Sequence, residues 1–425
     1  MGGKKIALIQ WQRSAGQKTN RPTLWSYIFW GVFLGGLGVG LLPAQEKFQD
    51  TWKTFFLDLP RSGQSTGGIA YPSEGSEPEE PLPWVSYQEG ASLRPSSAAH
   101  VPELARYLDQ VQIGQPVFYR QLAVYPIFLE RGVRLEGQWL TLDQAMRQGV
   151  LVVTEKDGGS VPVIIVENRS RDEYVFLMTG EILSGGKQTR TVRQDVVLAP
   201  GQRVDLNVFC VERGRWHGEE KFLRSERMAP LMVQKQIVQG EGQSSVWGAI
   251  GGLAARLRAS NPSENLEMAL DAPHVRQDLE KVHKEIMPRI PDKTMGFLFL
   301  QGRRPMGADM FGDARIARQL LPKLLDAYAV DCILLDKDAP AAERAEADRE
   351  AIEFFQRIVR AGSQRAQTPG SGAGIRTDAL GLVGGGVSFG DTLVHYGVYV
   401  RSEPIIPMPH PKPMEGFRPH RPLED

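Results

Sequence analysis

Two short runs near the middle of the chain hold most of the residues whose types could do chemistry. Residues 180–190 read GEILSGGKQTR, and residues 209–216 read FCVERGRW. Each run places charged and amide side chains among glycines and apolar residues that are typical of buried strands. Burying a polar group without a partner is costly. The two runs therefore predict a functional site whose polar groups are held by specific partners.

Candidates for binding an anion lie in and beside these runs: Lys187, Gln188, Arg190, Arg215 and Trp216. Guanidinium groups recognise phosphate and carboxylate through paired hydrogen bonds. Gly185-Gly186, just before Lys187, would let backbone amides approach the same anion. The indole of Trp216 could stack on a base or a sugar. Two simpler interpretations stay open: the glycine pair forms an ordinary turn, and Trp216 belongs to the core.

Two carboxylates, Glu181 and Glu212, are the candidates for catalysis. Either could act as a general base if burial raised its pKa. Either could equally well accept a salt bridge. The residues alone therefore leave open whether the protein is an enzyme.

A hairpin is predicted around Pro200-Gly201, which separates two apolar stretches. With the turn centred on Gly201, the facing pairs are Leu198 with Val204, Val196 with Leu206, Val192 with Cys210, and Arg190 with Glu212. Side chains alternate along strands, so these pairs share one face. The sheet would bury an aliphatic ladder that ends in an arginine–carboxylate pair. That pair is either purely structural or part of the site.

The two runs resemble the signature of the ADP-ribosylglycohydrolase- and rhodanese-phosphatase-associated domain family, roughly G-E-x-L-x-G-x-K-Q-x-R followed by C-V-E-x-G-R-W. The matching positions are Gly180, Glu181, Leu183, Gly185, Lys187, Gln188, Arg190, Cys210, Val211, Glu212, Gly214, Arg215 and Trp216. Tyr125-Pro126, Leu140-Thr141-Leu142 and Ser160-Val161-Pro162 fit as well, so the resemblance spans residues 112–400. Thr191-Val192-Arg193 departs from the family, which has an Asn-containing stretch there. The resemblance implies a link to ADP-ribose or nucleotide metabolism by association, and no defined activity.

Charge and hydropathy suggest where the protein resides. The chain has 50 basic and 50 acidic residues among 425, and a zero net charge argues against general nucleic-acid binding. Residues 1–23 carry only basic charges, and residues 24–42 are uncharged and apolar. About 20 such residues span a bilayer as a helix, and the basic flank stays in the cytoplasm. We therefore expect a single-pass anchor in the cytoplasmic membrane, with the C-terminal domain outside the cytoplasm. A secreted protein, after cleavage of a signal, and a buried soluble helix are the alternatives.

The chain has two cysteines, Cys210 and Cys332. A disulfide between them is possible outside the cytoplasm, but their apolar neighbours favour buried thiols. His217 with Glu219 and Glu220 is a fragment of a metal site that a solvated polar loop explains better. The sequence holds no Cys/His cluster for zinc and no phosphate-loop, nucleophile-elbow or metalloprotease motif. No metal and no cofactor are predicted.

The remaining sequence predicts an α+β fold, mainly antiparallel sheet with an inserted helical segment, over residues 111–403. Residues 43–110 are a flexible spacer rich in Pro, Ser and Glu with a short helix at 98–108, and the Pro-rich tail, 404–425, is disordered. Strands are predicted at 117–129 with a bend at Pro126, 150–154, 161–167, 174–178, 189–198, 204–211, 295–300, 375–383 and 392–401. Helices are predicted at 142–149 with Thr141 as N-cap, 226–239, 244–258, 264–271, 275–286, 308–330 with Asp309 as its cap, and 341–360. Gly384-Gly385-Gly386 is predicted to form a hairpin turn.

Together these features predict a membrane-anchored domain that binds a small anionic molecule, nucleotide- or ADP-ribose-like, where the two runs meet. The alternative is a non-enzymatic envelope scaffold or protein-interaction domain, in which the same charges only hold the sheet together. Protein partners are not predicted.

Overall fold

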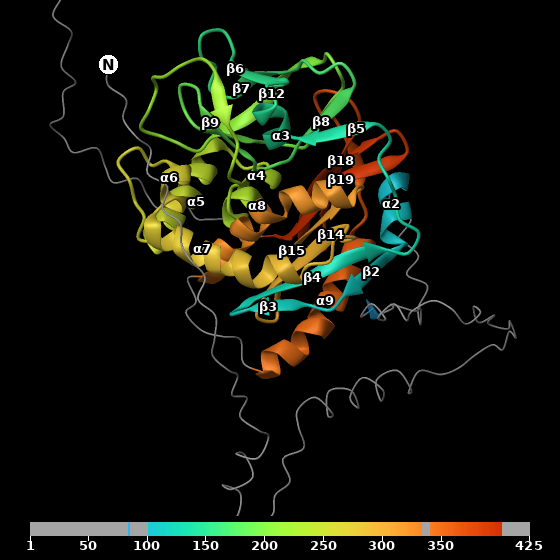
Figure 1. Cartoon of the computed structure of the whole chain (residues 1–425). Helices are drawn as coiled ribbons and strands as arrows, with labels where there is room; N and C mark the ends of the chain where they lie inside the picture. Colours follow the sequence, from blue (N-terminus) through green and yellow to red (C-terminus); the bar gives the residue numbers. More distant parts are fainter. Residues whose placement is uncertain (1–83, 86–100, 334–340, 402–425) are drawn as a thin grey trace, which may run out of the picture. The chain divides into compact units, whose positions relative to one another are not determined.

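The computed structural model describes residues 84–85, 101–333 and 341–401. They form an α+β fold of mostly antiparallel sheets (Figure 1). The helical segment between the sheets is present as the sequence predicts. The folded part begins earlier than residue 111, because a short strand and a helix precede it. The helix, α2 (Pro102–Leu108), is tied to the body by Glu103, whose carboxylate accepts two hydrogen bonds of 2.7 Å from Arg365.

The largest sheet has ten strands in the order β1-β2-β4-β14-β15-β19-β18-β17-β16, with β3 beside β4. Their bounds are β1 (Trp84–Val85), β2 (Val111–Gly114), β3 (Val117–Tyr119), β4 (Leu122–Leu129), β14 (Gly296–Gln301), β15 (Arg304–Phe311), β16 (Gln364–Ala366), β17 (Ala373–Ala379), β18 (Leu382–Phe389) and β19 (Thr392–Val400). All neighbouring strands of this sheet, including β3 and β4, pair in antiparallel orientation.

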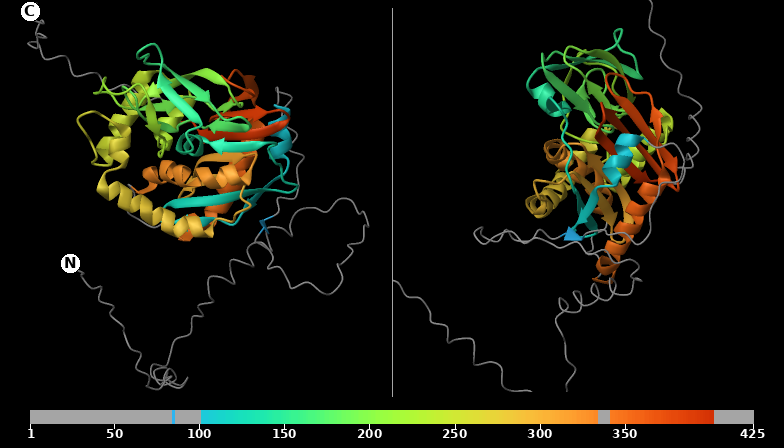
Figure 2. Two further views of the ribbon diagram at one scale, coloured as in Figure 1. Left: turned by 45° about the horizontal axis from the view of Figure 1, so that its top comes forward. Right: turned by 90° about the vertical axis from the view of Figure 1, so that its right-hand side faces the viewer.

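Helices cover both faces of this sheet (Figure 2). Alternate residues of β14 point to opposite faces, as a strand requires. Phe297 and Phe299 join the core under α8 (Ala314–Ile333), whereas Leu298 and Leu300 pack with α9 (Ala341–Ala361). A sheet buried on both sides explains why β14 reads as a continuous apolar run.

Two smaller sheets enclose a second core. The six-stranded sheet has the order β13-β9-β10-β12-β7-β6, and the three-stranded sheet has the order β11-β8-β5. Their bounds are β5 (Gln138–Thr141), β6 (Leu151–Glu155), β7 (Val163–Asn168), β8 (Glu173–Leu177), β9 (Ile182–Gly185), β10 (Arg190–Val192), β11 (Val196–Leu198), β12 (Arg203–Cys210) and β13 (Phe222–Arg224). Helix α3 (Leu142–Arg147) begins after Thr141 at its N-cap, as predicted, and the backbone N–H of Thr141 donates to Gln144.

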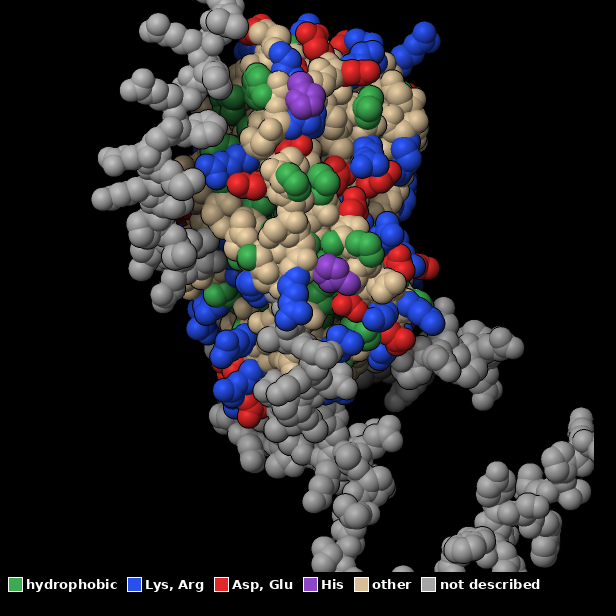
Figure 3. Space-filling view, turned by 90° about the vertical axis from the view of Figure 1, so that its left-hand side faces the viewer, with side chains coloured by type: hydrophobic (Ala, Val, Ile, Leu, Met, Phe, Trp, Pro, Cys, Tyr) green, Lys and Arg blue, Asp and Glu red, His purple; other side chains and the backbone are tan. Residues whose placement is uncertain are grey.

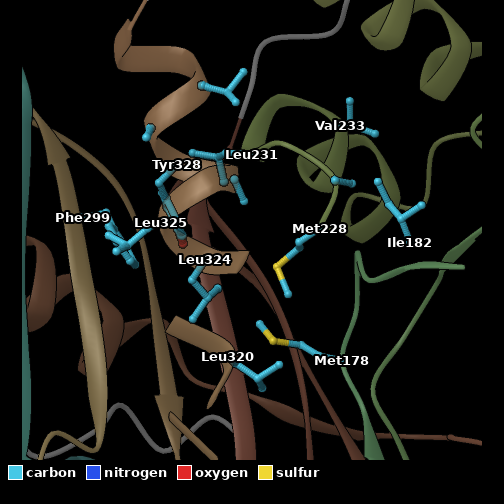
Figure 4. Close-up of a cluster of buried hydrophobic side chains, with 14 of the residues drawn as sticks. Met178, Ile182, Met228, Leu231, Val233, Phe299, Leu320, Leu324, Leu325 and Tyr328 are labelled. Carbon is cyan, nitrogen blue, oxygen red and sulfur yellow. The ribbon is translucent and has the colours of Figure 1, made fainter. Parts of the chain in front are cut away.

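The helical segment joins the smaller sheets to the large one. It comprises α4 (Leu231–Val238), α5 (Gln243–Arg256), α6 (Leu266–Leu270), α7 (Pro273–Ile286) and a short 3-10 turn, η1 (Met287–Arg289). Figure 4 shows how Met178, directly after β8, and Ile182 of β9 approach Met228 and the α8 side chains Leu320 and Leu324. One continuous apolar cluster therefore links the sequence around the first run to the large sheet.

Several predicted elements are wrong. The helix expected at 308–330 begins only at Ala314, because residues 304–311 form β15, so Asp309 lies inside a strand and caps no helix. The strand expected at 189–198 divides into β10 and β11, which belong to different sheets. Gly384-Gly385-Gly386 lies within β18, and the turn comes earlier, at Leu380-Gly381.

The strand expected at 117–129 is also two strands, β3 and β4, with a turn at Arg120 where φ is 52°. Pro126 lies within β4, opposite Phe297 of β14, and does not mark a bend between two halves.

The expectation of a transmembrane helix needs correction. Across 84–85, 101–333 and 341–401, the structure contains no helix that is long and apolar enough to cross a membrane. Residues 24–42, on which the expectation rested, lie outside the described residues, as do the basic N-terminus and the Pro-rich tail.

Candidate functional site

The structure brings the two runs together as neighbouring strands of the six-stranded sheet. β10 pairs with β9 on one side and with β12 on the other, so Arg190 lies opposite both Leu183 and Cys210. The predicted register, with Arg190 opposite Glu212 and Val192 opposite Cys210, is wrong by two residues. Because side chains alternate with a period of two, this error changes the partner of each residue but not the face it occupies.

The remainder of the predicted hairpin does not form. β11 pairs with β8, so Leu198 lies opposite Val175, while Val204 of β12 lies opposite Val166 of β7. The apolar ladder is still buried, as part of the core between the two smaller sheets.

Arg190 is the most unusual side chain of the site, because its guanidinium is fully buried. Its Nη1 donates to Gln188 Oε1 over 2.9 Å, and Nη2 lies 3.8 Å from Glu155 Oε2. Among the described residues, Nε and Nη2 of Arg190 and Oε2 of Glu155 have no hydrogen-bond partner. A buried donor or acceptor atom without a partner is costly, which makes Arg190 and Glu155 the residues to consider for contact with a ligand.

Glu155 is a part of the site that the sequence analysis missed. It ends β6, and its Oε1 accepts a hydrogen bond of 2.7 Å from the backbone N–H of Lys187. The strand alternates buried and half-buried residues, with Leu151, Val153 and Glu155 pointing inward. A carboxylate at an inward position of such an alternation was the signal that could have revealed it.

Gly186 brings the backbone close to this carboxylate. Its φ of 58° is in the left-handed region, and a Cβ there would lie 2.5 Å from Phe222 and 2.8 Å from Glu155 Oε1. Only glycine fits at this position without displacing its neighbours. The glycine pair is therefore a turn shaped around the buried carboxylate.

Trp216 and Lys187 lie over the buried arginine. The Trp216 ring centroid is 5.6 Å from Arg190 Cζ and 6.0 Å from Lys187 Nζ, within the range of cation–π attraction. Trp216 is 45% exposed, so it covers the guanidinium from the solvent side. The Lys187 ammonium donates to the carbonyl of Gly158.

Arg215 and Glu212 form a separate, hydrogen-bonded ion pair beside this cluster. All five N–H groups of the Arg215 guanidinium are engaged, by the Glu212 carboxylate and the carbonyl oxygens of Gly185, Gly186 and His217. Burial raises the pKa of Glu212, but hydrogen bonds from Arg215, Thr189 and Asn265 outweigh it and lower the pKa overall. An ionised, fully bonded carboxylate is a poor proton acceptor.

Glu181 has different partners. Its Oε1 lies 2.7 Å from Lys323 Nζ of α8, its Oε2 accepts from the backbone N–H of Met178 over 2.8 Å, and Lys323 also contacts Asp143. Burial raises the pKa of Glu181 to about 7, aided by Asp143 and opposed by Lys323. Glu181 is buried and both of its carboxylate oxygens have hydrogen-bond partners.

Cys210 and Cys332 are both free and buried in the structure, which confirms the interpretation as buried thiols. Burial raises the pKa of each thiol. The Cys210 sulfur lies near Arg190 and Glu155, which act on its pKa in opposite directions. A thiol with a raised pKa is a weak nucleophile at neutral pH.

Both runs lie within the part of the chain that a family comparison matches. The model of the ARG and Rhodanese-Phosphatase-superfamily-associated Protein domain, ARPP-1, matches residues 110–399. The chain belongs to the ARPP-1 family. This confirms the resemblance carried by the two runs. No curated protein matches the chain, and no solved structure matches it either.

The predicted site residues of this ARPP-1 domain thus separate into three groups. Gln188, Trp216 and Glu155 lie around Arg190, and Lys187 joins them through Trp216 and Glu155; Arg215 and Glu212 bond to each other; and Glu181 bonds to α8. The first group has unmet hydrogen-bonding capacity among the described residues, and for that reason it is the candidate site.

Proposed function

We propose that this domain binds a small anionic molecule, nucleotide- or ADP-ribose-like, at Arg190. The observation that carries the proposal is the fully buried guanidinium whose Nε and Nη2 find no partner in the described part of the chain. Two adjacent N–H donors on one planar group suit the paired oxygens of a phosphate or a carboxylate.

The surroundings of Arg190 favour a ligand with both an acid and an aromatic or sugar part. Trp216 offers a half-exposed ring for stacking, and Lys187 adds a second positive charge at the entrance. The unpartnered Oε2 of Glu155 would accept a ligand hydroxyl. Because Trp216 covers the guanidinium, its indole must move aside when the ligand enters.

A small anion fits better than an extended polyanion. Figure 3 shows basic and acidic side chains interspersed over the described part of the face that holds α5, α6 and α7. An extended polyanion requires a continuous basic surface. A single buried arginine with one lysine at its entrance requires only one acid group.

The test is a thermal-shift titration of the full-length protein with inorganic phosphate, ADP and ADP-ribose. A ligand at about 100 times its dissociation constant should stabilise the fold by about 2.7 kcal/mol. We expect stabilisation by at least one of these probes, and its loss in Lys187→Ala and Trp216→Ala. Lys221→Ala removes one exposed positive charge nearby and serves as the matched control, which should respond like the wild type.

A change in Trp216 fluorescence upon ligand addition, obtained as the difference between wild type and Trp216→Phe, should accompany binding. Stabilisation that is equal in the wild type and in Lys187→Ala and Trp216→Ala would place the ligand elsewhere and refute the proposal.

The second candidate function is a non-enzymatic scaffold, in which the motif charges only hold the sheet together. The engagement of all five Arg215 N–H groups favours it. If no probe stabilises the protein while Arg215→Ala and Glu212→Ala both destabilise it, the scaffold is the better account.

A further inference from the structure

A polar cavity, whose lining does not include Arg190, lies between the large sheet and the smaller sheets. Its volume is about 320 Å³. Its walls come from β17 and β18, the last turn of α4, and the turns before β9 and β11. The lining residues that the argument uses are Thr179, Arg193, Asp195, Arg376 and Gly385. Cavities of this size accommodate small molecules of the size of a sugar phosphate.

A buried chain of hydrogen bonds fixes the polar end of this cavity. Asp195 Oδ1 accepts from both the backbone N–H and the hydroxyl of Thr179, and Asp195 Oδ2 lies 2.6 Å from His395 Nδ1. His395 Nε2 lies 3.2 Å from Asp309, which accepts a hydrogen bond of 2.7 Å from Tyr328. Each of these side chains is almost fully buried.

The charges of the lining favour an anionic ligand. Asp195 is the acidic residue of the lining, and its two carboxylate oxygens are already bonded to Thr179 and His395. Arg193 and Arg376 remain as the lining's positive charges. Arg193 stacks on the ring of Phe209, and Arg376 lies 3.8 Å from the exposed Asp378. Because exposed ion pairs are weak, both guanidinium groups remain able to bind an acid group.

The glycine-rich strand β18 leaves one wall of the cavity without side chains. A Cβ at Gly385 would meet, among the described atoms, only the carbonyl oxygen of Ile375 at 3.8 Å, which is an ordinary contact. A Cβ at Gly384 would lie 2.8 Å from the carbonyl oxygen of Gly397. Strand packing therefore requires glycine at 384 but not at 385, where the missing side chain serves to keep the cavity open.

We propose that this cavity is a second ligand site, separate from Arg190, for a small hydroxylated acid such as a sugar phosphate. Arg193 and Arg376 bind the acid group. Polar lining residues, Thr368 and Gln367 among them, form hydrogen bonds with the hydroxyl groups of the ligand. The Asp195–His395 pair positions the turn that carries Arg193.

The experiment uses the full-length protein with ribose 5-phosphate at millimolar concentration, and with uncharged ribose as the matched control ligand. We expect ribose 5-phosphate, and not ribose, to raise the melting temperature by several degrees. The shift should disappear in Arg193→Gln and in Arg376→Gln. It should persist in Arg134→Gln, which removes an exposed arginine away from the cavity lining.

Gly385→Leu tests the cavity without altering charge, because Gly385→Ala is sterically allowed and the larger side chain fills the open space. Gly385→Leu should fold, with an unchanged melting temperature in the absence of ligand, and should lose the shift. A wild-type protein that does not respond to ribose 5-phosphate, or a response that survives all three cavity variants, would overturn the proposal. A response lost in Lys187→Ala but kept in Arg193→Gln would assign the ligand to Arg190 instead.

Discussion

At the scale of single residues, the Arg215 guanidinium makes an unusually large number of hydrogen bonds within the ARPP-1 domain. Its five N–H groups join the loop after β12 to the glycine turn after β9, with Glu212 between them. The side chain is 25% exposed, yet its contacts are those of a structural clamp. The loop that carries Trp216 is held in place by this clamp.

Replacing Arg215 by lysine should destabilise the domain by about 2 kcal/mol, because an ammonium cannot reproduce the planar set of donors. Urea unfolding measures the change. Arg213→Lys is the matched control: its guanidinium pairs with Glu264, with both side chains 52% exposed, and lies 5.3 Å from the Trp247 ring centroid. An ammonium can make both contacts, so the loss should be below about 1 kcal/mol. Equal effects of the two substitutions would show that the hydrogen bonds of Arg215 stabilise the domain no more than an exposed ion pair does.

His395 should make stability depend on pH. Burial lowers the pKa of an imidazole, but Asp195 and Asp309 outweigh burial and raise the pKa of His395 to about 9. A folded-state pKa above the unfolded value of about 6.5 means that the stabilisation is complete below pH 6.5 and is lost as the pH rises through about 9. At about 1.4 kcal/mol per unit, it amounts to about 3 kcal/mol.

We therefore expect His395→Gln to be about 3 kcal/mol less stable than the wild type at pH 6, and the difference to shrink towards pH 10. Urea unfolding across this range checks it. His217→Gln, in an exposed loop, is the control and should leave the pH profile unchanged. A constant difference at every pH would show that His395 contributes by shape and not by charge.

At the scale of elements, the short helix α6 supports the first run. Asn265 caps it by accepting from the backbone N–H of Met268 and also donates to Thr189 of the run, both over 3.2 Å. Ser184 of β9 donates to Glu267 of the same helix over 2.7 Å. A helix of five residues has little stability of its own, so these bonds hold helix and run together.

Asn265→Ala should cost about 1 to 2 kcal/mol, from the lost cap and the lost bond to Thr189. Amide hydrogen exchange should accelerate in Leu266–Leu270 and around Thr189. Asn265→Ser keeps a capping oxygen and should recover most of the stability. Unchanged exchange at Thr189 in Asn265→Ala would show that helix and run are independent.

How much the sequence predicts also depends on the element. Alternation and apolar runs locate β6, β7, β8 and β14, because burial of one or both faces leaves a direct trace in the residue pattern. The same rules misassign residues 304–311. Their mixed sequence, RPMGADMF, does not look like a buried strand, yet it forms β15 and contains the buried Asp309. Asp309 is tolerated there because His395 and two tyrosines, distant in sequence, bond to it.

The candidate site was predictable only in part, for the same reason. Lys187, Gln188, Arg190 and Trp216 come from the two runs, and the structure gathers them. Glu155 comes from another strand, and its role depends on tertiary pairing. The register error at Arg190 arose because β11 leaves the sheet for β8, and no Gly or Pro between Val192 and Val196 marks that change.

At the scale of the whole molecule, one apolar cluster connects the sheets. It includes Phe176 and Phe209 of the smaller sheets, Phe297 and Phe299 of the large sheet, and Leu324 of α8. A shared core of this kind couples the unfolding of the parts that it joins. We expect a single transition, with tryptophan fluorescence and far-ultraviolet circular dichroism reporting the same midpoint.

Leu324→Ala should lower both midpoints together, by about 3 kcal/mol of unfolding free energy, because it leaves a cavity in the shared core. Leu380→Ala, at a side chain that is 56% exposed, is the control and should change neither. Separate midpoints for the two probes in Leu324→Ala would indicate that the sheets unfold independently.

The ten-stranded sheet ends in two very short strands, β1 with two residues and β16 with three. An edge strand presents unpaired N–H and C=O groups to which a strand of another chain can attach. Edges this short offer few such groups, and β3, which pairs with β4 alone, is just as short, so the other seven strands are paired on both sides. A truncation that removed β1 would expose the edge of β2 and should favour self-association by edge-to-edge pairing at high protein concentration.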